Sequence, residues 1–258
     1  TITIKNVTTD ETYNEEYDVL ILSPGAKPIV PPIPGIEEAK ALFTLRNVPD
    51  TDRIKAYIDE KKPRHATVIG GGFIGVEMVE NLRERGIEVT LVEMANQVMP
   101  PIDYEMAAYV HEHMKVHNVE LVFEDGVDAL EENGTVVRLK SGSVIKTDMI
   151  ILAIGVQPES SLAKDAGLAL GVRGTIKVNE KFQTSDPYVY AIGDAIEVKD
   201  FVTETETMIP LAWPANRQGR MLADIIHGHT DSLYKGTLGT SVAKVFDLTV
   251  ASTGVNEK

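Results

Sequence analysis

A glycine-rich stretch near residue 70 has the spacing needed to hold the phosphates of a nucleotide. Gly70, Gly72 and Gly75 form the pattern G-x-G-x-x-G, directly after the apolar run ATVI. The first glycine permits a tight turn, the second lets the backbone approach a pyrophosphate, and the third lets the next helix pack close to the sheet. The helix N-terminus adds the positive end of its dipole. The pattern predicts a dinucleotide site formed by Gly70, Gly71, Gly72, Phe73, Ile74 and Gly75.

A carboxylate stands where the ribose of that dinucleotide would need it. Glu93 ends the next predicted strand, 18 positions after Gly75 (93 minus 75), and a carboxylate at this spacing binds ribose hydroxyls. A 2′-phosphate requires an arginine near the same strand end, but residues 93–101 contain no arginine or lysine. The sequence therefore favours NADH. NADPH stays open, because Arg83 and Arg85 lie on the preceding predicted helix.

A second pattern typical of a ligand site lies far from this loop. In the segment VYAIGDA, residues 189–195, an apolar strand ends in Gly193 and Asp194. Such an ending places one carboxylate against the hydroxyls of a sugar. The sequence has no second G-x-G-x-x-G loop, so this segment is interpreted as part of a second, incomplete nucleotide site.

Composition narrows the possible partners. The chain has 258 residues, 39 acidic against 25 basic, and a net charge of −14; this charge repels nucleic acid and anionic membranes, so we expect neither as a partner. No apolar run approaches the roughly 18 residues of a membrane span. The absence of cysteine excludes disulfides and thiol chemistry by this chain itself. No signal peptide is visible, and we expect a cytoplasmic location.

Histidines raise the question of a metal site. His113 and His117 are four residues apart on a predicted helix that also carries His111. The sequence contains no H-E-x-x-H motif, and Glu112 and Lys115 beside them are typical of a solvated helix face. We expect no metal site here.

Alternating apolar runs predict an α/β fold. Around the glycine loop we expect a strand, a helix over 74–85 and a strand at 88–93. A helix over 103–117 follows, with Met106, Val110 and Met114 on one apolar face. A hairpin at the KSGS turn and a buried strand MIILAIG come next. Residues 24–35 hold five of the 13 prolines and predict an extended connector. Pro214 predicts the start of a helix that runs to about residue 226. Residues 241–253 alternate like one antiparallel strand.

Five segments, taken in order, carry a resemblance to a known family. They are YDVLILSPGAKP, VIGGGFIGVEM, ILAIGVQPES, VYAIGDA and PLAWPANRQGR. The chain resembles the flavoprotein (pyridine nucleotide) disulfide reductases, and within them the CoA-disulfide reductase branch, which includes fusions to a rhodanese domain. The resemblance implies a Rossmann-like NAD-binding domain (35–153) inserted in an incomplete FAD-binding domain (1–34 and 154–230), then the start of an α+β dimerisation domain (231–258).

The resemblance also implies roles for individual residues. Phe73 would be the aromatic gate between nicotinamide and flavin, with Glu77 beside the nicotinamide; both also have a structural interpretation, as a core aromatic and as a carboxylate favoured by a helix N-terminus. Asp194 would bind the FAD ribitol, or serve only as a turn residue. The other implied contacts are Gly155 and Val156 for NAD, and Ser23, Pro24, Gly25, Gly193, Leu211, Ala212 and Trp213 for FAD.

The implied activity is reduction of CoA disulfide or CoA persulfide by NADH, with hydride passing to FAD and electrons then to a cysteine outside this chain. An NADH oxidase or peroxidase, and a non-catalytic NAD-binding module, are the alternatives. The family opens with a FAD phosphate loop and a redox cysteine, and this sequence has neither. We therefore expect an internal fragment of a homodimeric parent, inactive alone, with weak or absent FAD binding.

Overall fold

The computed structural model describes residues 1–229 and 232–257, which divide into two compact units. The first unit comprises Thr1–Ala26 and Pro158–Leu238, and the second comprises Lys27–Gln157 and Gly239–Lys258. Each unit is thus assembled from two separate stretches of chain. The predicted ranges of the NAD-binding, FAD-binding and dimerisation domains stay predictions, and the expected boundary between residues 230 and 231 lies outside the described residues.

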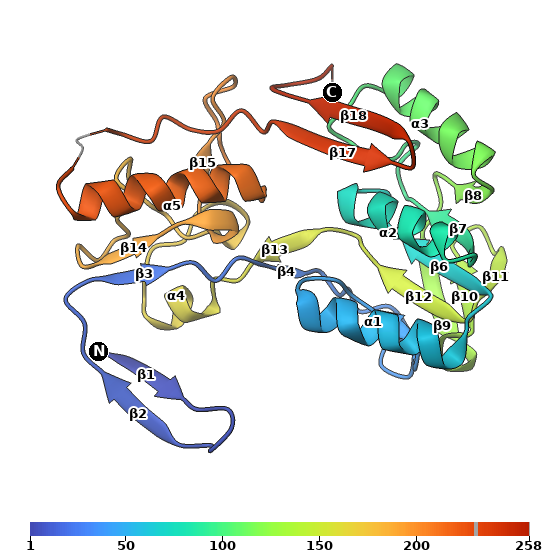
Figure 1. Cartoon of the computed structure of the whole chain (residues 1–258), viewed down its shortest axis with the longest axis horizontal. Helices are drawn as coiled ribbons and strands as arrows, with labels where there is room; N and C mark the ends of the chain where they lie inside the picture. Colours follow the sequence, from blue (N-terminus) through green and yellow to red (C-terminus); the bar gives the residue numbers. More distant parts are fainter. Residues whose placement is uncertain (230–231, 258) are drawn as a thin grey trace. The chain divides into compact units, whose positions relative to one another are not determined.

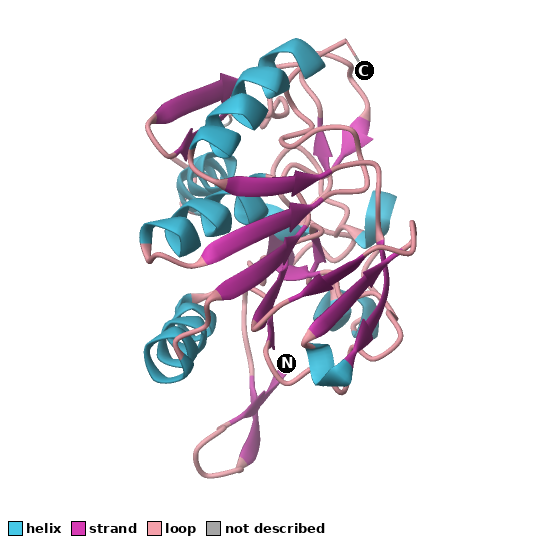
Figure 2. Cartoon of the chain, turned by 90° about the vertical axis from the view of Figure 1, so that its right-hand side faces the viewer, coloured by secondary structure: helices cyan, strands magenta, loops and turns pink. Residues whose placement is uncertain are grey.

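Among its described residues, the second unit is built on a five-stranded parallel sheet whose strands run side by side in Figure 2. In spatial order these are β5 (Leu42–Phe43), β12 (Met149–Leu152), β6 (His65–Ile69), β7 (Glu88–Val92) and β8 (Val119–Val122). Neighbouring residues of the central strands are buried on opposite faces of the sheet. This explains why β6 and β12 are continuous apolar runs.

Helices cover one face of this sheet (Figure 1). They are α1 (Val48–Lys61), α2 (Phe73–Glu84) and α3 (Tyr104–Val116). Asn47 and Asp50 form a capping box that begins α1, as their side chains accept each other's backbone N–H. The buried side of α3 includes Val110 and Met114, as predicted, but Met106 is exposed and Ala107 takes the core position.

A smaller antiparallel sheet covers the opposite face. It consists of β9 (Val127–Glu131), β10 (Val136–Leu139) and β11 (Val144–Lys146), with a short 3₁₀ turn η1 (Glu132–Gly134) after β9. Leu130, Val137 and Leu139 from this sheet share a core cluster with Ile69 and Ile150 of the parallel sheet. The second unit therefore has three layers, and the predicted α/β class with a Rossmann-like parallel sheet is confirmed.

The C-terminal segment of the second unit is a hairpin that packs against α2 (Figure 1). Its strands are β17 (Ser241–Val245) and β18 (Leu248–Ser252), paired antiparallel. The expectation of one strand over 241–253 was wrong, because Phe246 and Asp247 form a two-residue turn and Val245 pairs with Leu248. The hairpin is joined to α2 by Glu80, whose carboxylate accepts the N–H of Phe246 at 2.9 Å.

The first unit has a parallel pair at its centre, β3 (Leu20–Leu22) beside β14 (Val189–Ala191). The hydrophobic core of this unit includes residues of both strands, the fully buried Phe182 and Ile176, and Leu222 of helix α5 (Ala212–Ile226). The remaining elements are the antiparallel pairs β1 (Ile2–Lys5) with β2 (Thr12–Glu15) and β15 (Val198–Lys199) with β16 (Glu206–Thr207), the helix α4 (Ser161–Asp165), and the turns η2 (Val172–Gly174) and η3 (Gly193–Ala195).

The chain passes between the two units in β4 (Ala26–Pro28) and β13 (Val156–Pro158), which pair with each other. β4 lies within the proline-rich residues 24–35, for which the sequence predicts an extended connector. No helix within the described residues combines the length and apolarity that crossing a bilayer demands.

The Glu80 contact leads to a stability prediction. Replacing Glu80 by Ala leaves the buried N–H of Phe246 without an acceptor, which costs about 1–3 kcal/mol. We expect the free energy of unfolding in urea to fall by that amount, and the Phe246 amide to exchange its hydrogen faster. Glu84→Ala, an exposed position one turn further along α2, should change stability by less than about 0.5 kcal/mol. An equal loss in both variants would contradict the proposed anchor.

Candidate nucleotide sites

The predicted phosphate loop lies at a topological switch point of the parallel sheet. The chain goes from β6 outward to β7 and β8, then returns to the other side of β6 with β12. The carboxyl ends of β6 and β12 therefore meet where strand order reverses, which is where open α/β sheets bind ligands. The N–H of Gly70 donates to Val92 O at 2.8 Å, and the N–H of Ala153 donates to Ile69 O at 2.8 Å.

Two glycines of the loop occupy positions that exclude any side chain. Gly70 has φ +108°, and a Cβ there would lie 2.4 Å from the carbonyl oxygen of Ala153. A Cβ on Gly75 would lie 1.9 Å from the carbonyl oxygen of Gly70. Both obstacles are backbone atoms, so neither can move aside as a side chain would. This close approach brings the first turn of α2 against the ends of β6 and β12.

Gly72 has the opposite environment. A Cβ on Gly72 would meet no described atom within 4 Å, and Gly72 is the N-cap of α2 without a side-chain cap. The backbone N–H groups of the first turn have no intrahelical acceptor, and no side chain caps the N-terminus of α2. This is the geometry that an anionic pyrophosphate requires.

Glu93 lies against the loop, at the end of β7. Its carboxylate accepts the N–H of Gly71 at 2.6 Å and the N–H of Ala95 at 2.8 Å. The guanidinium of Arg83 donates to the carbonyl oxygens of His117 and Ile87, at 3.1 and 2.9 Å. One of the two arginines that kept NADPH open is therefore directed to other acceptors, which favours NADH.

The remaining residues assigned to NAD follow the same edge. Phe73 and Ile74 are half-buried and pack against the core of the second unit. Glu77, one turn later, is exposed, and partial desolvation, followed by the nearby Glu80 carboxylate, raises its pKa. Gly155 is exposed with φ +121°, and its carbonyl oxygen accepts the N–H of Ile29 at 3.0 Å. The assigned roles of Phe73 and Glu77 stay predictions.

The residues assigned to FAD converge within the first unit. Because β3 and β14 are parallel neighbours, their carboxyl ends place Ser23–Gly25 and Gly193–Asp194 at one edge. The N–H of Ile192 donates to Leu22 O at 3.0 Å. The N-terminus of α5 packs against η3, which contains Gly193 and Asp194. The Asp194 carboxylate and the N-terminus of α5 therefore lie close together. This is the combination needed for a ligand that has both hydroxyl and anionic groups.

Asp194 is the unusual group of this cluster. Its side chain is half-buried, and burial raises the pKa of its carboxyl. Among the described residues, none donates a hydrogen bond to the Asp194 carboxylate. A partly desolvated carboxylate without a donor is suited to accept the hydroxyls of a ligand.

Helix α5 begins two residues before the predicted start at Pro214. Leu211 is its N-cap, and Ala212 and Trp213 open the first turn. A proline in the first turn costs nothing, because no intrahelical acceptor is available there for its missing N–H. Trp213 is 73% exposed, so it is not a core residue.

Sequence analysis missed Gln218. Its side chain is buried and its carbonyl oxygen accepts the N–H of Gly193 at 2.7 Å, while its amide donates to the hydroxyl of Tyr234 at 3.2 Å. Gln218 therefore fixes the turn that aims Asp194. The available signal was a polar residue four positions before Leu222, on the apolar face of a helix.

A family model described as pyridine nucleotide-disulphide oxidoreductase matches residues 1–219. The chain belongs to this family. A curated relative, coenzyme A disulfide reductase from Staphylococcus aureus, is 36% identical over 255 residues, which are 99% of this chain and 57% of that protein. The chain thus spans about half the length of the curated relatives it matches. This confirms the family resemblance drawn from the five sequence segments.

Solved structures of related proteins are also similar to this chain. The crystal structure of reduced Bacillus anthracis CoADR-RHD is 95% identical, with a TM-score of 0.98 over 99% of this chain and 46% of that one. An NAD-dependent persulfide reductase from A. fulgidus is 36% identical, with a TM-score of 0.92 over 99% and 47%. A water-forming NADH oxidase from Lactobacillus brevis is 30% identical, with a TM-score of 0.89 over 98% and 56%.

The contact between Gly75 and Gly70 leads to a prediction for the loop. Gly75→Ala forces a methyl group against a backbone oxygen, so we expect a loss of more than about 2 kcal/mol in the free energy of unfolding. Gly72→Ala adds the same methyl group where space is free and should cost less than about 1 kcal/mol. Urea unfolding of both variants measures the difference. Comparable stability in the two variants would refute the steric argument.

The raised pKa of Asp194 predicts a pH dependence. The folded chain binds this proton more tightly than the unfolded chain, so the contribution to stability is present at low pH and is lost as pH rises through the folded pKa. At pH 7 the ionised carboxylate is therefore destabilising, and Asp194→Asn should raise the melting temperature. The gain should narrow as pH falls toward the ordinary aspartate pKa of about 3.9.

Asp165→Asn is the control for this pH series, because Asp165 is an exposed aspartate of the same unit. Its melting temperature should follow that of the unsubstituted chain at every pH. A gain at pH 7 that is the same for both variants, or absent from both, would show that burial of Asp194 has no energetic consequence.

Proposed function

We propose that this chain is part of an NADH-dependent FAD oxidoreductase that reduces CoA disulfide or CoA persulfide. The observation that carries the proposal is the complete phosphate loop with its paired Glu93, placed at the switch point of the parallel sheet. Family membership supports an oxidoreductase. Relatives named coenzyme A disulfide reductase and NAD-dependent persulfide reductase support the substrate class.

NADH fits the loop of the second unit. The free N-terminus of α2 and the unobstructed Gly72 would hold the pyrophosphate, while Glu93 would take the adenosine ribose hydroxyls in exchange for one of its present backbone donors. Gly155 and Val156 would border the nicotinamide, with Phe73 and Glu77 on the first two turns of α2.

FAD fits the described cluster of the first unit in part. Asp194 would accept the ribitol hydroxyls, which supplies the donors its carboxylate lacks, and Gly193 permits close approach with φ +82°. Ser23, Pro24 and Gly25 would border the same ligand, and the backbone from Leu211 to Trp213 would meet the flavin through the start of α5. The sequence offers no second phosphate loop, so this chain alone should bind FAD weakly or not at all.

When bound, NADH would supply a hydride and FAD would accept it. For CoA disulfide, one disulfide, one NADH and one proton would give two thiols and NAD⁺; for CoA persulfide, the products would be one thiol, hydrogen sulfide and NAD⁺. The chain itself contains no cysteine, so the thiol that attacks the substrate must come from outside it. The work of these residues is orientation: fixing the dinucleotide at the switch point and keeping a negative charge at the ribitol. A homodimeric parent and a cytoplasmic location are further proposals that rest on the family resemblance.

An NADH oxidase is the second candidate, since a relative of that name has the same fold over 98% of this chain. The reductase and the oxidase proposals are distinguished by an assay of the full-length protein that contains this chain. Consumption of NADH, followed at 340 nm, should be faster with CoA disulfide or CoA persulfide than with dioxygen or hydrogen peroxide. Faster turnover with dioxygen or peroxide would replace the reductase with the oxidase or peroxidase.

Calorimetry on the 258-residue chain tests the cofactor assignment itself. Titration with NADH should give one site, and titration with FAD should give weak or no binding. NADH binding without any reaction in the full-length protein would leave only a non-catalytic NAD-binding module. Failure of NADH to bind would remove the proposal.

Glu93 gives the sharpest variant for this test. Glu93→Gln removes the charge and one of the two acceptor oxygens at the loop. We expect NADH affinity to fall at least about 10-fold, because hydrogen bonds to charged groups contribute about 1.5–3 kcal/mol. NADPH affinity should fall less, since its 2′-phosphate gains from the lost charge. Glu88→Gln, at the other end of β7, should leave both affinities unchanged. The ribose assignment fails if Glu93→Gln binds NADH as tightly as Glu88→Gln does.

A further inference from the structure

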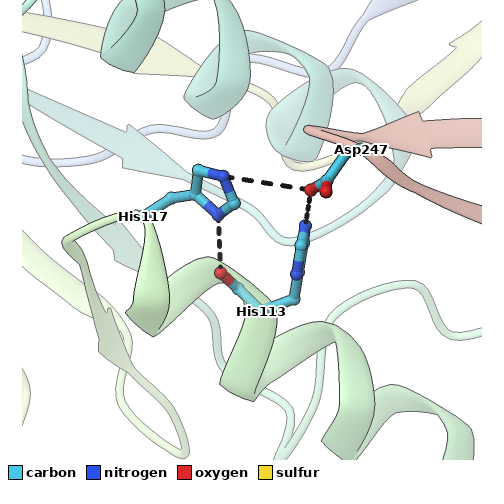
Figure 3. A group of neighbouring side chains, drawn as sticks. All are labelled: His113, His117 and Asp247. Atoms are coloured by element: carbon cyan, nitrogen blue, oxygen red, sulfur yellow. Dashed lines mark hydrogen bonds and ion pairs between the residues drawn. The ribbon is translucent and has the colours of Figure 1, made fainter.

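Three potential metal ligands from distant parts of the sequence meet at the end of α3, away from the nucleotide loop. His113 and His117 lie one turn apart, and Asp247 comes from the turn between β17 and β18. One donor atom from each side chain lies within 4.8 Å of the others. Figure 3 shows both rings and the carboxylate turned toward one another. All three residues belong to the second unit.

The hydrogen bond of His117 fixes which of its nitrogens is free. Its Nδ1 lies 2.9 Å from the carbonyl oxygen of His113, which can only accept, so Nδ1 carries the hydrogen. The neutral ring then presents the lone pair of Nε2 to Asp247 Oδ1, at 4.0 Å. A carbonyl contact of this kind is the usual support of a metal-binding histidine, because it fixes the tautomer and orients the ring.

His113 presents the same carboxylate oxygen with a second nitrogen. Its Nε2 is 2.7 Å from Asp247 Oδ1, shielded from solvent, and without a hydrogen-bond partner of acceptable geometry among the described residues. Two nitrogens thus converge on one carboxylate oxygen. When both nitrogens are unprotonated, their lone pairs face a negative oxygen, and a cation among the three atoms relieves that repulsion.

The scaffold holds the carboxylate in place. Phe246, next to Asp247, stacks on the ring of His117 with centroids 3.9 Å apart and planes 6° apart. The backbone of Phe246 has φ +55°, a conformation that residues other than glycine rarely adopt. Its N–H donates to the Glu80 carboxylate. The turn is therefore fixed on both sides, and strain of this kind is often found at ligand sites.

We propose that His113, His117 and Asp247 bind one divalent transition-metal ion of the zinc class, with water completing the shell. Two imidazoles and one carboxylate are a set that Zn²⁺ accepts with an open position, whereas Mg²⁺ and Ca²⁺ prefer oxygen ligands alone. Ligand atoms on a tetrahedral zinc lie roughly 3.3 Å apart, between the two N···O distances of 2.7 and 4.0 Å. Small rotations of the rings would equalise them.

Access and local charge allow such an ion. The Asp247 side chain is 84% exposed, and His117 and Asp247 line an open pocket with Arg83 and Lys244. The two cations are directed elsewhere, Arg83 to backbone carbonyls and Lys244 to Glu80 at 3.7 Å. The sequence pattern of the helix alone indicated no metal site, because the third ligand lies 130 positions after His117 (247 minus 117).

Calorimetric titration of the tag-free 258-residue chain with ZnCl₂ tests the site. We expect one ion per chain, weaker binding as pH falls from 7.5 to 5.5 because protons compete for both imidazoles, and Co²⁺ absorption bands that mark nitrogen and oxygen ligands. Asp247→Asn should weaken Zn²⁺ binding about 10-fold or more, and His113→Gln should remove it. His227→Ala, which changes an exposed histidine of the first unit, should bind as the unsubstituted chain does.

Melting curves without metal show whether each variant folds, and with Zn²⁺ only the chains that keep all three ligands should gain stability. The proposal is overturned if the chain takes up no stoichiometric Zn²⁺. It is equally overturned if folded Asp247→Asn and His113→Gln bind Zn²⁺ with unchanged affinity, or if His227→Ala loses the site. A plain protonated histidine–aspartate pair would give the first of these results.

Discussion

The second unit depends on one close approach, that of the Gly75 Cα to the Gly70 carbonyl, where a Cβ would stand 1.9 Å from the oxygen. No other residue allows α2 to begin so near the ends of β6 and β12. Because of this contact, the unpaired N–H groups of the first turn face the switch point, and Glu93 is close enough to accept the Gly71 N–H. The steric requirement and the binding chemistry are therefore one constraint, since a larger residue at Gly75 would move the helix dipole away from the phosphate position.

The first unit uses the same arrangement with different chemistry. Again two parallel strands end side by side and a helix begins beside them, but here the polar group at the strand ends is the half-buried Asp194 carboxylate rather than a set of backbone N–H groups. Gln218 binds the Gly193 N–H, so the turn is rigid although the carboxylate has no donor. An ionised carboxylate in this position costs stability, and a hydrogen-bond donor at its oxygens would lower that cost.

Local patterns predicted the parts that depend on neighbours in sequence. The glycine spacing, the acid at Glu93, the buried strands and the α/β class follow from periodicity and loop sterics, and all are present in the structure. The start of α5 was placed two residues late, because Leu211 caps through its backbone alone. The hairpin turn at Phe246 could not be predicted, since the residues that contact it, Glu80 and His117, lie more than 100 residues earlier.

That turn shows what holds the last segment of the second unit. Residues 239–258 return to residues 27–157 after an excursion of about 80 residues through the first unit, and closing so long a loop costs entropy that grows with the logarithm of its length. The hairpin offers few fully buried side chains, among them Ala243, Val245 and Phe246. Its docking therefore also requires directional contacts, which the Glu80 hydrogen bond and the Asp247 carboxylate supply at the two helices α2 and α3. The carboxylate contact is the weaker as it stands, because it is exposed and screened by solvent.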